Sequence, residues 1–331
     1  MTRSLSYDIG LDNGRTVGEI VAIARAAEDS GFNTIWIAEQ HFRRGAFSIA
    51  AAVAEATSTL DIGFGILSPF VRHPAAICME MVSLTEQWGD RFKLGYGVAH
   101  HGSLQLGTVP SNQVGALREA ATATRALLDG GTAYNGARLD QRPPRIPLYV
   151  GSIGEQTLVM SADAYDGSLL GVMCSPAFIE SRAARIDEAL GAAGRSRDEY
   201  DLGALVLTAV SDDPEQAMCV ARRSVAYYLM AIPDVSPRLI GTGVERAELV
   251  ALRASLHDAN ANDGIETAAA LIPDDLVHLL AVVGTADEVA QRLAELLRLG
   301  LDRVAPHHAL GADAPASVRQ LGAAVKALGG S

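Results

Sequence analysis

Residues 61–74 read DIGFGILSPFVRHP, and this stretch decides the fold. Its first half, residues 62–67, alternates glycine with bulky apolar residues, which is typical of a buried strand that another backbone or a flat ligand approaches closely. The second half holds the cationic pair Arg72-His73, and Pro74 stands where the first turn of a helix should begin. A buried strand, a short polar loop and a helix form the βα unit on which ligand sites in α/β proteins are built. We interpret the loop as the edge of a cofactor pocket, with a purely structural turn as the alternative.

Outward from this stretch, the same strand-then-helix unit recurs along the chain. Eight strands are predicted, at residues 7–11, 34–38, 62–67, 92–97, 148–151, 168–172, 202–210 and 304–305. Eight βα units in roughly 250 residues plus insertions predict an α/β fold of the (β/α)8 TIM-barrel type, in a single domain over residues 1–331. Residues 231–273 are helix-prone and polar, and are predicted to form an insertion after strand seven that caps the barrel mouth. A doubly wound open sheet is the competing fold, but no GxGxxG motif follows the first strand.

Composition narrows the class of protein. Of the 331 residues 49% are hydrophobic and 20% are charged, a balance that suits a compact enzyme. The formal net charge of −12 argues against a nucleic-acid partner, because nucleic-acid-binding domains usually carry a basic face. No apolar run is long enough for a membrane span, and no signal segment begins the sequence, so a cytoplasmic protein without a membrane partner is expected. The three cysteines have no metal-ligand spacing.

Polar residues follow the second predicted strand, where barrel chemistry is expected because active sites lie at the carboxyl ends of barrel strands. Glu39 and His41 are two residues apart. A carboxylate and an imidazole at a barrel mouth can hydrogen-bond a ring system or move a proton near neutral pH. The alternative is an ion pair between Glu39 and a nearby arginine, with His41 in a solvated loop.

Four further histidines follow strands four and eight: His100, His101, His307 and His308. They could face a substrate, the cofactor or solvent, and their roles stay open. No third ligand with suitable spacing accompanies them, so no metal site is predicted.

Residues 151–154 join the fifth predicted strand to a helix. The four residues are Gly151, Ser152, Ile153 and Gly154. Two glycines and a serine before a helix leave backbone N–H groups free, and these can bind a phosphate. The alternative is an ordinary N-cap by Ser152.

Four segments in order carry a family resemblance: WIAEQH at residues 36–41, the block at 63–97 that ends in GDRFKLGYG, PLYVGS with ADAYDG at 147–167, and VGTADEV followed by GAD at 283–313. Together they resemble the bacterial-luciferase-like oxidoreductases, in the branch of the methylenetetrahydromethanopterin reductases that use the deazaflavin coenzyme F-420. The resemblance spans nearly the whole chain and implies a (β/α)8 barrel with an insertion after strand seven.

The resemblance also implies roles for particular residues. His41, with Glu39, would face the hydride-accepting edge of the cofactor. Residues Gly65, Ile66 and Leu67 would back the flavin-like ring at a non-prolyl cis peptide. The remaining cofactor contacts would come from Val98, Ala99 and His100 after strand four, and from residues 151–154, which would bind the phosphate.

Two departures from the family pattern argue against a pterin substrate. Relatives often carry an acid where this chain has residues 98–100, and the pterin reductases carry a buried glutamate in the first strand, where this chain has Gly10 with Asp12 beyond it.

The resulting hypothesis is an oxidoreductase that transfers hydride between coenzyme F-420 and a small organic substrate, such as an imine, an enone or an alcohol. An FMN-dependent monooxygenase of the same fold is one alternative, and a non-catalytic flavin-binding barrel subunit is another. Abundant alanine-rich helices favour a homodimer.

Overall fold

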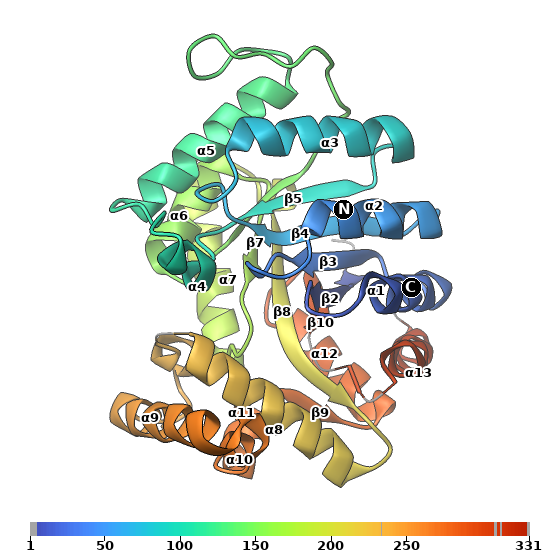
Figure 1. Ribbon diagram of the computed structural model, residues 1–331, viewed down its shortest axis with the longest axis vertical. Helices are drawn as coiled ribbons and strands as arrows, with labels where there is room; N and C mark the ends of the chain where they lie inside the picture. The colour runs from blue at the N-terminus through green and yellow to red at the C-terminus, as the bar shows by residue number, and fades with distance from the viewer. Residues whose placement is uncertain (1–4, 233, 308–309, 312, 330–331) are drawn as a thin grey trace.

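A closed barrel of parallel strands forms the centre of the molecule (Figure 1). The computed structural model describes residues 5–232, 234–307, 310–311 and 313–329. Within them the barrel strands are β2 (Ile9–Asp12), β3 (Thr34–Ala38), β4 (Asp61–Leu67), β5 (Phe92–Tyr96), β6 (Leu148–Gly151), β7 (Gly167–Leu170), β8 (Asp201–Val210) and β10 (Arg303–His307). Strand β10 pairs with β2 on one side and with β8 on the other, and the short β1 (Ser6–Tyr7) pairs with β10 ahead of β2. This closure confirms the (β/α)8 barrel and excludes an open sheet.

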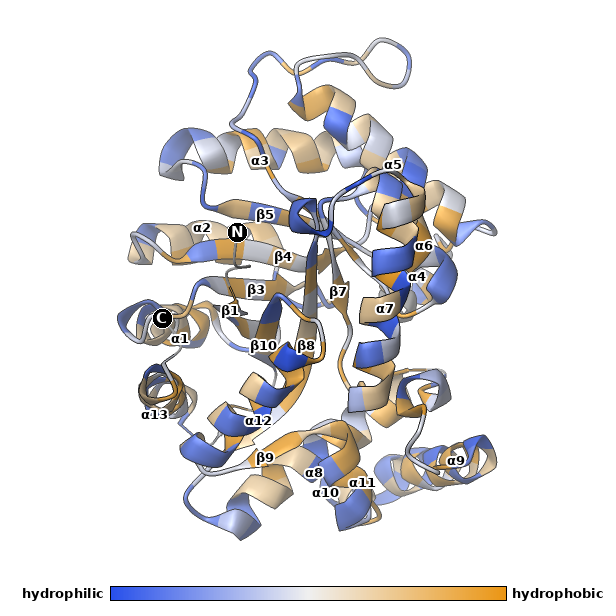
Figure 2. Cartoon of the chain, turned by 180° about the vertical axis from the view of Figure 1, so that it is seen from behind, coloured by the Kyte–Doolittle hydropathy of each residue, from blue (hydrophilic) through white to orange (hydrophobic). Residues whose placement is uncertain are grey.

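Helices cover the outside of the barrel. They are α1 (Val17–Asp29), α2 (Ala46–Ala56), α3 (Pro74–Trp88), α5 (Gln113–Leu128), α6 (Glu155–Ala164), α7 (Pro176–Ala192), α12 (Ala286–Arg298) and α13 (Ala314–Ala327). Local chemistry explains several starts: Thr16 forms a capping box with Glu19, and proline begins α3 and α7. In Figure 2, α7 and α12 carry both hydrophilic and hydrophobic stretches, as expected of helices that bury one face.

The chain between β8 and α12 is mainly helical. It contains α8 (Pro214–Ala231), a short 3-10 turn η2 (Ser236–Leu239), α9 (Arg246–Asp263), α10 (Ile265–Ala269), α11 (Asp274–Leu280) and the strand β9 (Val282–Gly284). Helices α8 to α11 gather at one end of the molecule (Figure 1). Their apolar residues, including Leu229, Leu249 and Leu256, belong to the same buried cluster as Leu205 and Leu207 of β8. The helices are therefore packed onto the barrel as one body.

Strand β8 has two different neighbours along one edge. Its first half pairs with β10, with Gly203 opposite Arg303, and its second half pairs with β9, with Thr208 opposite Val282. The helical segment is therefore inserted next to the β8–β10 pairing that closes the barrel.

Three large side chains fill the barrel interior toward the amino ends of the strands. The rings of Trp36 and Tyr149 meet edge to face at 5.0 Å, and the guanidinium of Arg303 lies 5.7 Å from the Trp36 ring centre. Glycines on neighbouring strands make the room. A Cβ at Gly63 would lie 2.3 Å from the Trp36 ring, and one at Gly203 would lie 2.4 Å from Cγ of Arg303.

A buried ion cluster surrounds that arginine. Arg303 donates to Asp8 Oδ2 at 2.7 Å and to Asp201 Oδ1 at 2.8 Å, while Tyr149 donates its hydroxyl to Asp201 at 3.0 Å. Burial acts to raise the pKa of Asp201, but the nearby Arg303 outweighs it and holds that pKa below its usual range. The cluster lies at the amino ends of the strands and seals the barrel floor. A ligand must therefore enter from the opposite end, at the carboxyl ends of the strands.

Candidate active site

The barrel mouth opens into a hollow of about 1040 Å³. Its walls come from the loops after β2 and β3, from the short helix α4 (His100–Gln105), and from α8 and α9. Examples are Asp12, Arg43, Leu104, Tyr227 and Arg253. Because the mouth of a barrel is where strand ends present their side chains, this hollow and the strand ends beside it form the candidate active site. None of the site residues predicted from the sequence is among the described residues that line the hollow itself.

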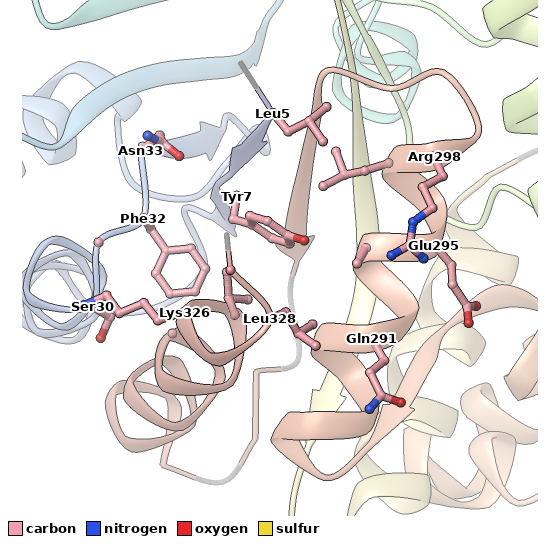
Figure 3. A pocket seen from close by; sticks show the side chains of 16 residues that line it. Leu5, Tyr7, Ser30, Phe32, Asn33, Gln291, Glu295, Arg298, Lys326 and Leu328 are labelled. Atoms are coloured by element: carbon pink, nitrogen blue, oxygen red, sulfur yellow. The ribbon is translucent and has the colours of Figure 1, made fainter. Parts of the chain in front are cut away.

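A second hollow, of about 740 Å³, lies at the opposite end of the barrel (Figure 3). Tyr7 and Phe32 line it, together with Arg298 and Lys326 near the carboxyl ends of α12 and α13. Cations at these positions are accounted for by the negative ends of the helix dipoles. The sealed floor separates this hollow from the mouth.

The loop after β3 presents Glu39 and His41 at the mouth. Glu39 is only 8% exposed in its side chain, and its Oε1 accepts from Nη2 of Arg72, in the loop after β4, at 3.1 Å. Its backbone N–H also donates to the carbonyl of Ile66 at 3.2 Å. The ion pair anticipated as the alternative for Glu39 is therefore present, and Glu39 joins two mouth loops. His41 follows in the same loop and is half-buried.

Asn13 holds that loop in place, and the sequence reasoning missed it. Its side chain is 0% exposed, accepts from the backbone N–H of Gln40 at 3.0 Å, and donates to the carbonyls of Gln40 at 2.9 Å and Arg44 at 2.5 Å. These bonds tie the loop after β2 to the loop that carries His41. The sequence feature that could have identified Asn13 is an amide side chain directly after a strand and before Gly14.

The Gly65–Ile66 peptide is cis, as the resemblance implies. The register between β4 and β5 shifts at the same place. The side chain of Ile66 lies against glycines of two neighbouring strand ends: a Cβ at Gly97 would be 2.6 Å from its Cδ1, and one at Gly151 would be 3.3 Å from its Cγ2. Ile66 is partly exposed, whereas Gly65 and Leu67 are buried. Of these three residues, Ile66 therefore has the accessible side chain, whereas Leu67 packs in the core.

Two serines hold the turn after β5. Ser103 donates its hydroxyl to the carbonyl of Val98 at 2.7 Å and lies 3.2 Å from the hydroxyl of Ser68. Ala99 has a φ of 49°, so the chain turns sharply there. Helix α4 begins at His100; the side chains of His100 and His101, and the whole of His308, lie outside the described residues.

The amino end of α6 has no side-chain cap. The N-cap residue is Gly154 and not Ser152, so the ordinary-cap alternative for Ser152 is wrong. Ser152 is 1% exposed, and within the described residues its hydroxyl has no hydrogen-bond partner. Ile153 is half-buried, close to Gly171. The first-turn N–H groups of α6, which have no side-chain cap, and the buried hydroxyl of Ser152 thus lie near each other in sequence without a side-chain partner among the described residues, as expected of a site that receives an anion.

His307 ends β10 inside the mouth and is 2% exposed. Its Nε2 lies 3.0 Å from the hydroxyl of Tyr228 on α8. A Cβ at Gly10 would be 2.5 Å from its Nδ1, so the imidazole fills the space beside the first strand where a side chain would otherwise stand. Burial holds the pKa of Tyr228 well above its usual range. Sequence reasoning left His307 undecided, and the signal that it missed was the glycine opposite.

A family model described as luciferase-like monooxygenase matches residues 5–303. The chain belongs to the luciferase-like monooxygenase family. The 5,10-methylenetetrahydromethanopterin reductase of Archaeoglobus fulgidus is 28% identical over 313 residues, which cover 92% of this chain and 93% of the relative.

Two solved structures share the fold. The coenzyme F-420-dependent tetrahydromethanopterin reductase from Methanopyrus kandleri gives a TM-score of 0.86 at 23% identity, over 98% of this chain and 99% of that one. A secondary alcohol dehydrogenase in complex with an F-420–acetone adduct gives 0.78 at 16% identity, again over 98% and 99%. At these identities the likeness concerns the fold alone.

The part of the chain that the structure describes contains neither a candidate metal site nor a candidate membrane-spanning helix. No cluster of three or more potential metal-ligating residues occurs in it. None of its helices is both long and apolar enough to cross a bilayer.

Proposed function

We propose that this member of the luciferase-like family is an oxidoreductase that transfers hydride between coenzyme F-420 and a small organic substrate, such as an imine, an enone or an alcohol. The reductase activity named for the Archaeoglobus relative supports an oxidoreductase. A Mycobacterium tuberculosis relative, 26% identical over 310 residues, is named a putative coenzyme F-420-dependent oxidoreductase, which supports a deazaflavin enzyme. The observation that carries the proposal is the pairing of a partly exposed Ile66 at the cis peptide with the uncapped amino end of α6. A flat ring against Ile66 and a phosphate at α6 are the two parts of a flavin-type ligand.

At the ring end, Ile66 would back the ring, with the turn of Val98 and Ala99 at its side. His41 would hold or take up a proton on the reacting face, and the Glu39–Arg72 ion pair would keep its loop in position. Coenzyme F-420 supplies the hydride chemistry when it is bound, so the protein contributes orientation and electrostatics.

At the phosphate end, the N–H groups of residues 154 onward and the hydroxyl of Ser152 would donate to the phosphate oxygens. Arg182 of α7 supports this assignment. It makes no ion pair within the described residues, its guanidinium lies 4.6 Å from the Phe178 ring, and its charge helps to lower the pKa of Glu155 at the start of α6, after the larger effect of Arg185.

The family description favours a second candidate, an FMN-dependent monooxygenase. A non-catalytic flavin-binding subunit is a third. Both would share the ring and phosphate contacts, so the choice rests on which cofactor binds and on turnover. We also propose a substrate other than the pterin named for the relative, because His307 fills the space beside Gly10.

We further propose that residues 231–273 cap the mouth and belong to the same single domain as the barrel. The lining of the mouth by Arg253, His257 and Asn260 of α9 supports this role. A homodimer and a cytoplasmic location stay predictions, the first open to light scattering of the purified protein.

Fluorescence titration of the purified protein with oxidised F-420, reduced F-420 and FMN tests the cofactor. We expect micromolar or tighter binding of F-420 and weak binding of FMN. Ser152→Ala should weaken F-420 about tenfold, the loss of roughly one charge-assisted hydrogen bond, yet leave binding of the dephosphorylated deazaflavin riboside unchanged. Preference for FMN would overturn the proposal, and equal losses for both deazaflavins would remove Ser152 from the phosphate site.

A further inference from the structure

Arg238 is a buried cation that the family assignment does not explain. It lies in the turn η2 of the helical segment between β8 and β10 and is only 9% exposed. Its Nη1 donates to the carbonyl of Val172, in the loop after β7, at 3.0 Å. That is its one side-chain hydrogen bond within the described residues, and its Nε is buried without an acceptor. One edge of the guanidinium, formed by Nε and Nη2, therefore has no acceptor from the described chain.

Among the described carboxylates, Asp234 acts electrostatically on Arg238 without forming an ion pair with it. Arg238 makes no ion pair with a described carboxylate, although arginine is almost never buried without one. The carboxylate of Asp234 accepts a hydrogen bond from the hydroxyl of Ser236 and forms an ion pair with Arg246 at 3.0 Å. Burial raises the pKa of the neighbouring Cys174 to about 12, so its thiol stays neutral. Burial likewise lowers the pKa of Arg238 itself, and this effect is larger than the opposing effects of Cys174, Tyr228 and Asp234.

The position of Arg238 connects it to the mouth. It interacts electrostatically with Tyr228, whose hydroxyl lies 3.0 Å from Nε2 of His307 at the end of β10. The loop that it contacts follows β7, on the mouth side of the barrel. The proposed phosphate site, at the amino end of α6, follows a different strand. The hydrogen bond to the loop after β7 therefore places the cation at the mouth end of the barrel.

We propose that Arg238 binds a carboxylate of the substrate, so that the enzyme acts on small carboxylic acids that carry the reducible group. The Nε–Nη2 edge presents two parallel N–H donors, and this fork matches the two oxygens of a carboxylate. The inference rests on the proposed function and narrows its substrate class to imino acids, enoic acids or hydroxy acids. Because the arginine comes from the inserted segment, the segment selects the substrate while the barrel strands hold the cofactor.

A structural role is the competing explanation. The backbone of Arg238 accepts from Ser175 at 2.8 Å, and Ser175 Oγ donates to the carbonyl of Ile240 at 3.0 Å, so this turn is already held to the barrel without the guanidinium. A structural arginine would matter for stability only. It would not make the protein distinguish a carboxylate from an uncharged analogue.

The test compares but-2-enoate with but-2-enamide, which has nearly the same shape without the charge, by the shift each causes in the melting temperature. Ionic strength is held constant with sodium chloride. We expect but-2-enoate to raise the melting temperature of the wild type in a saturable way and the amide to have no such effect. In Arg238→Met the apparent affinity for but-2-enoate should fall at least tenfold, and Arg238→Lys, which keeps the charge and loses the fork, should be intermediate. Arg222→Met is the matched control, because Arg222 lies on α8 of the same segment, pairs with Asp274, and is not among the residues that line the mouth hollow.

Each result of this test either supports or overturns the assignment of Arg238 to a substrate carboxylate. Equal responses of the wild type to the enoate and the amide would overturn the proposal, even if Arg238→Met fails to fold. An undiminished response in Arg238→Met would overturn it as well. Repeating the titration with saturating F-420 separates the sources of the carboxylate: loss of the enoate response there would assign Arg238 to an acidic group of the cofactor and overturn the substrate assignment. Failure of F-420 to bind would sink the proposed function and leave the enoate response readable.

Discussion

Replacing Asn13 by alanine should damage both stability and cofactor binding. Three hydrogen bonds join this buried amide to the loop that carries His41. At about 1 kcal/mol net for each bond, the variant should lose about 3 kcal/mol of its free energy of unfolding. The loop of residues 40–44 would then be held less firmly in the free protein. Fixing one or two of its residues again on binding costs about 1 kcal/mol each, so the affinity for F-420 should fall about tenfold.

Chemical denaturation and F-420 titration measure the two effects. Tyr200→Phe is the control, because it removes a buried hydroxyl that contacts Ser161 and Ser168 at the opposite end of the barrel. It should cost about 1 kcal/mol and leave F-420 binding unchanged. The reasoning is refuted if Asn13→Ala unfolds with the wild-type free energy, or if its affinity for F-420 stays within twofold of the wild type.

Three further changes probe the site and the floor. Gly97→Ala would place a methyl group 2.6 Å from Cδ1 of Ile66, so we expect a loss of about 1–3 kcal/mol in stability and weaker F-420 binding; an unaltered titration would contradict the role of Ile66 as a ring support. His41→Asn should slow single-turnover hydride transfer by about 10²–10⁴-fold with F-420 affinity within about threefold, and an unchanged rate would remove His41 from the chemistry. The pKa of Asp201 is lowered in the folded protein, so its contribution to stability is full above its unfolded pKa of about 3.9 and is lost as the pH falls through the lower folded value. Asp201→Asn, which leaves Arg303 with one carboxylate, should therefore be less stable by about 2 kcal/mol at pH 7. Its unfolding free energy should also change less with pH in the acid range than that of the wild type. Equal slopes of unfolding free energy against pH below pH 4 in the two proteins would refute this.

The barrel could be predicted from the sequence because its strands are short apolar runs that end at polar residues or glycine. The predicted strand of residues 34–38 matches the structure at both ends, and a helix begins at Pro74 as predicted. Helix α4 and strand β9 were missed, since six and three residues are too few to show a period.

The site was predictable only where one segment holds the whole signal. The uncapped start of α6 is of that kind, whereas the cis Gly65–Ile66 peptide was implied by the family resemblance. Contacts between distant segments left no such mark: the packing of His307 against Gly10 joins residues almost 300 positions apart, and the burial of Arg238 depends on how the inserted helices pack. The sequence alone does not show which neighbour in the fold requires a glycine or an arginine at a given position.

The shared edge of β8 has a consequence for how new specificities could arise in this protein. Because β10 pairs with the first half of β8 and β9 with the second half, the barrel remains hydrogen-bonded through Gly203 to Leu207 whatever segment joins α8 to α11. Residues 232–273 can therefore be exchanged for the corresponding segment of a relative as a cassette, with both splice points in elements that are already anchored. Such chimaeras would retain the cofactor apparatus and inherit their choice of acid, alcohol or imine from the donor.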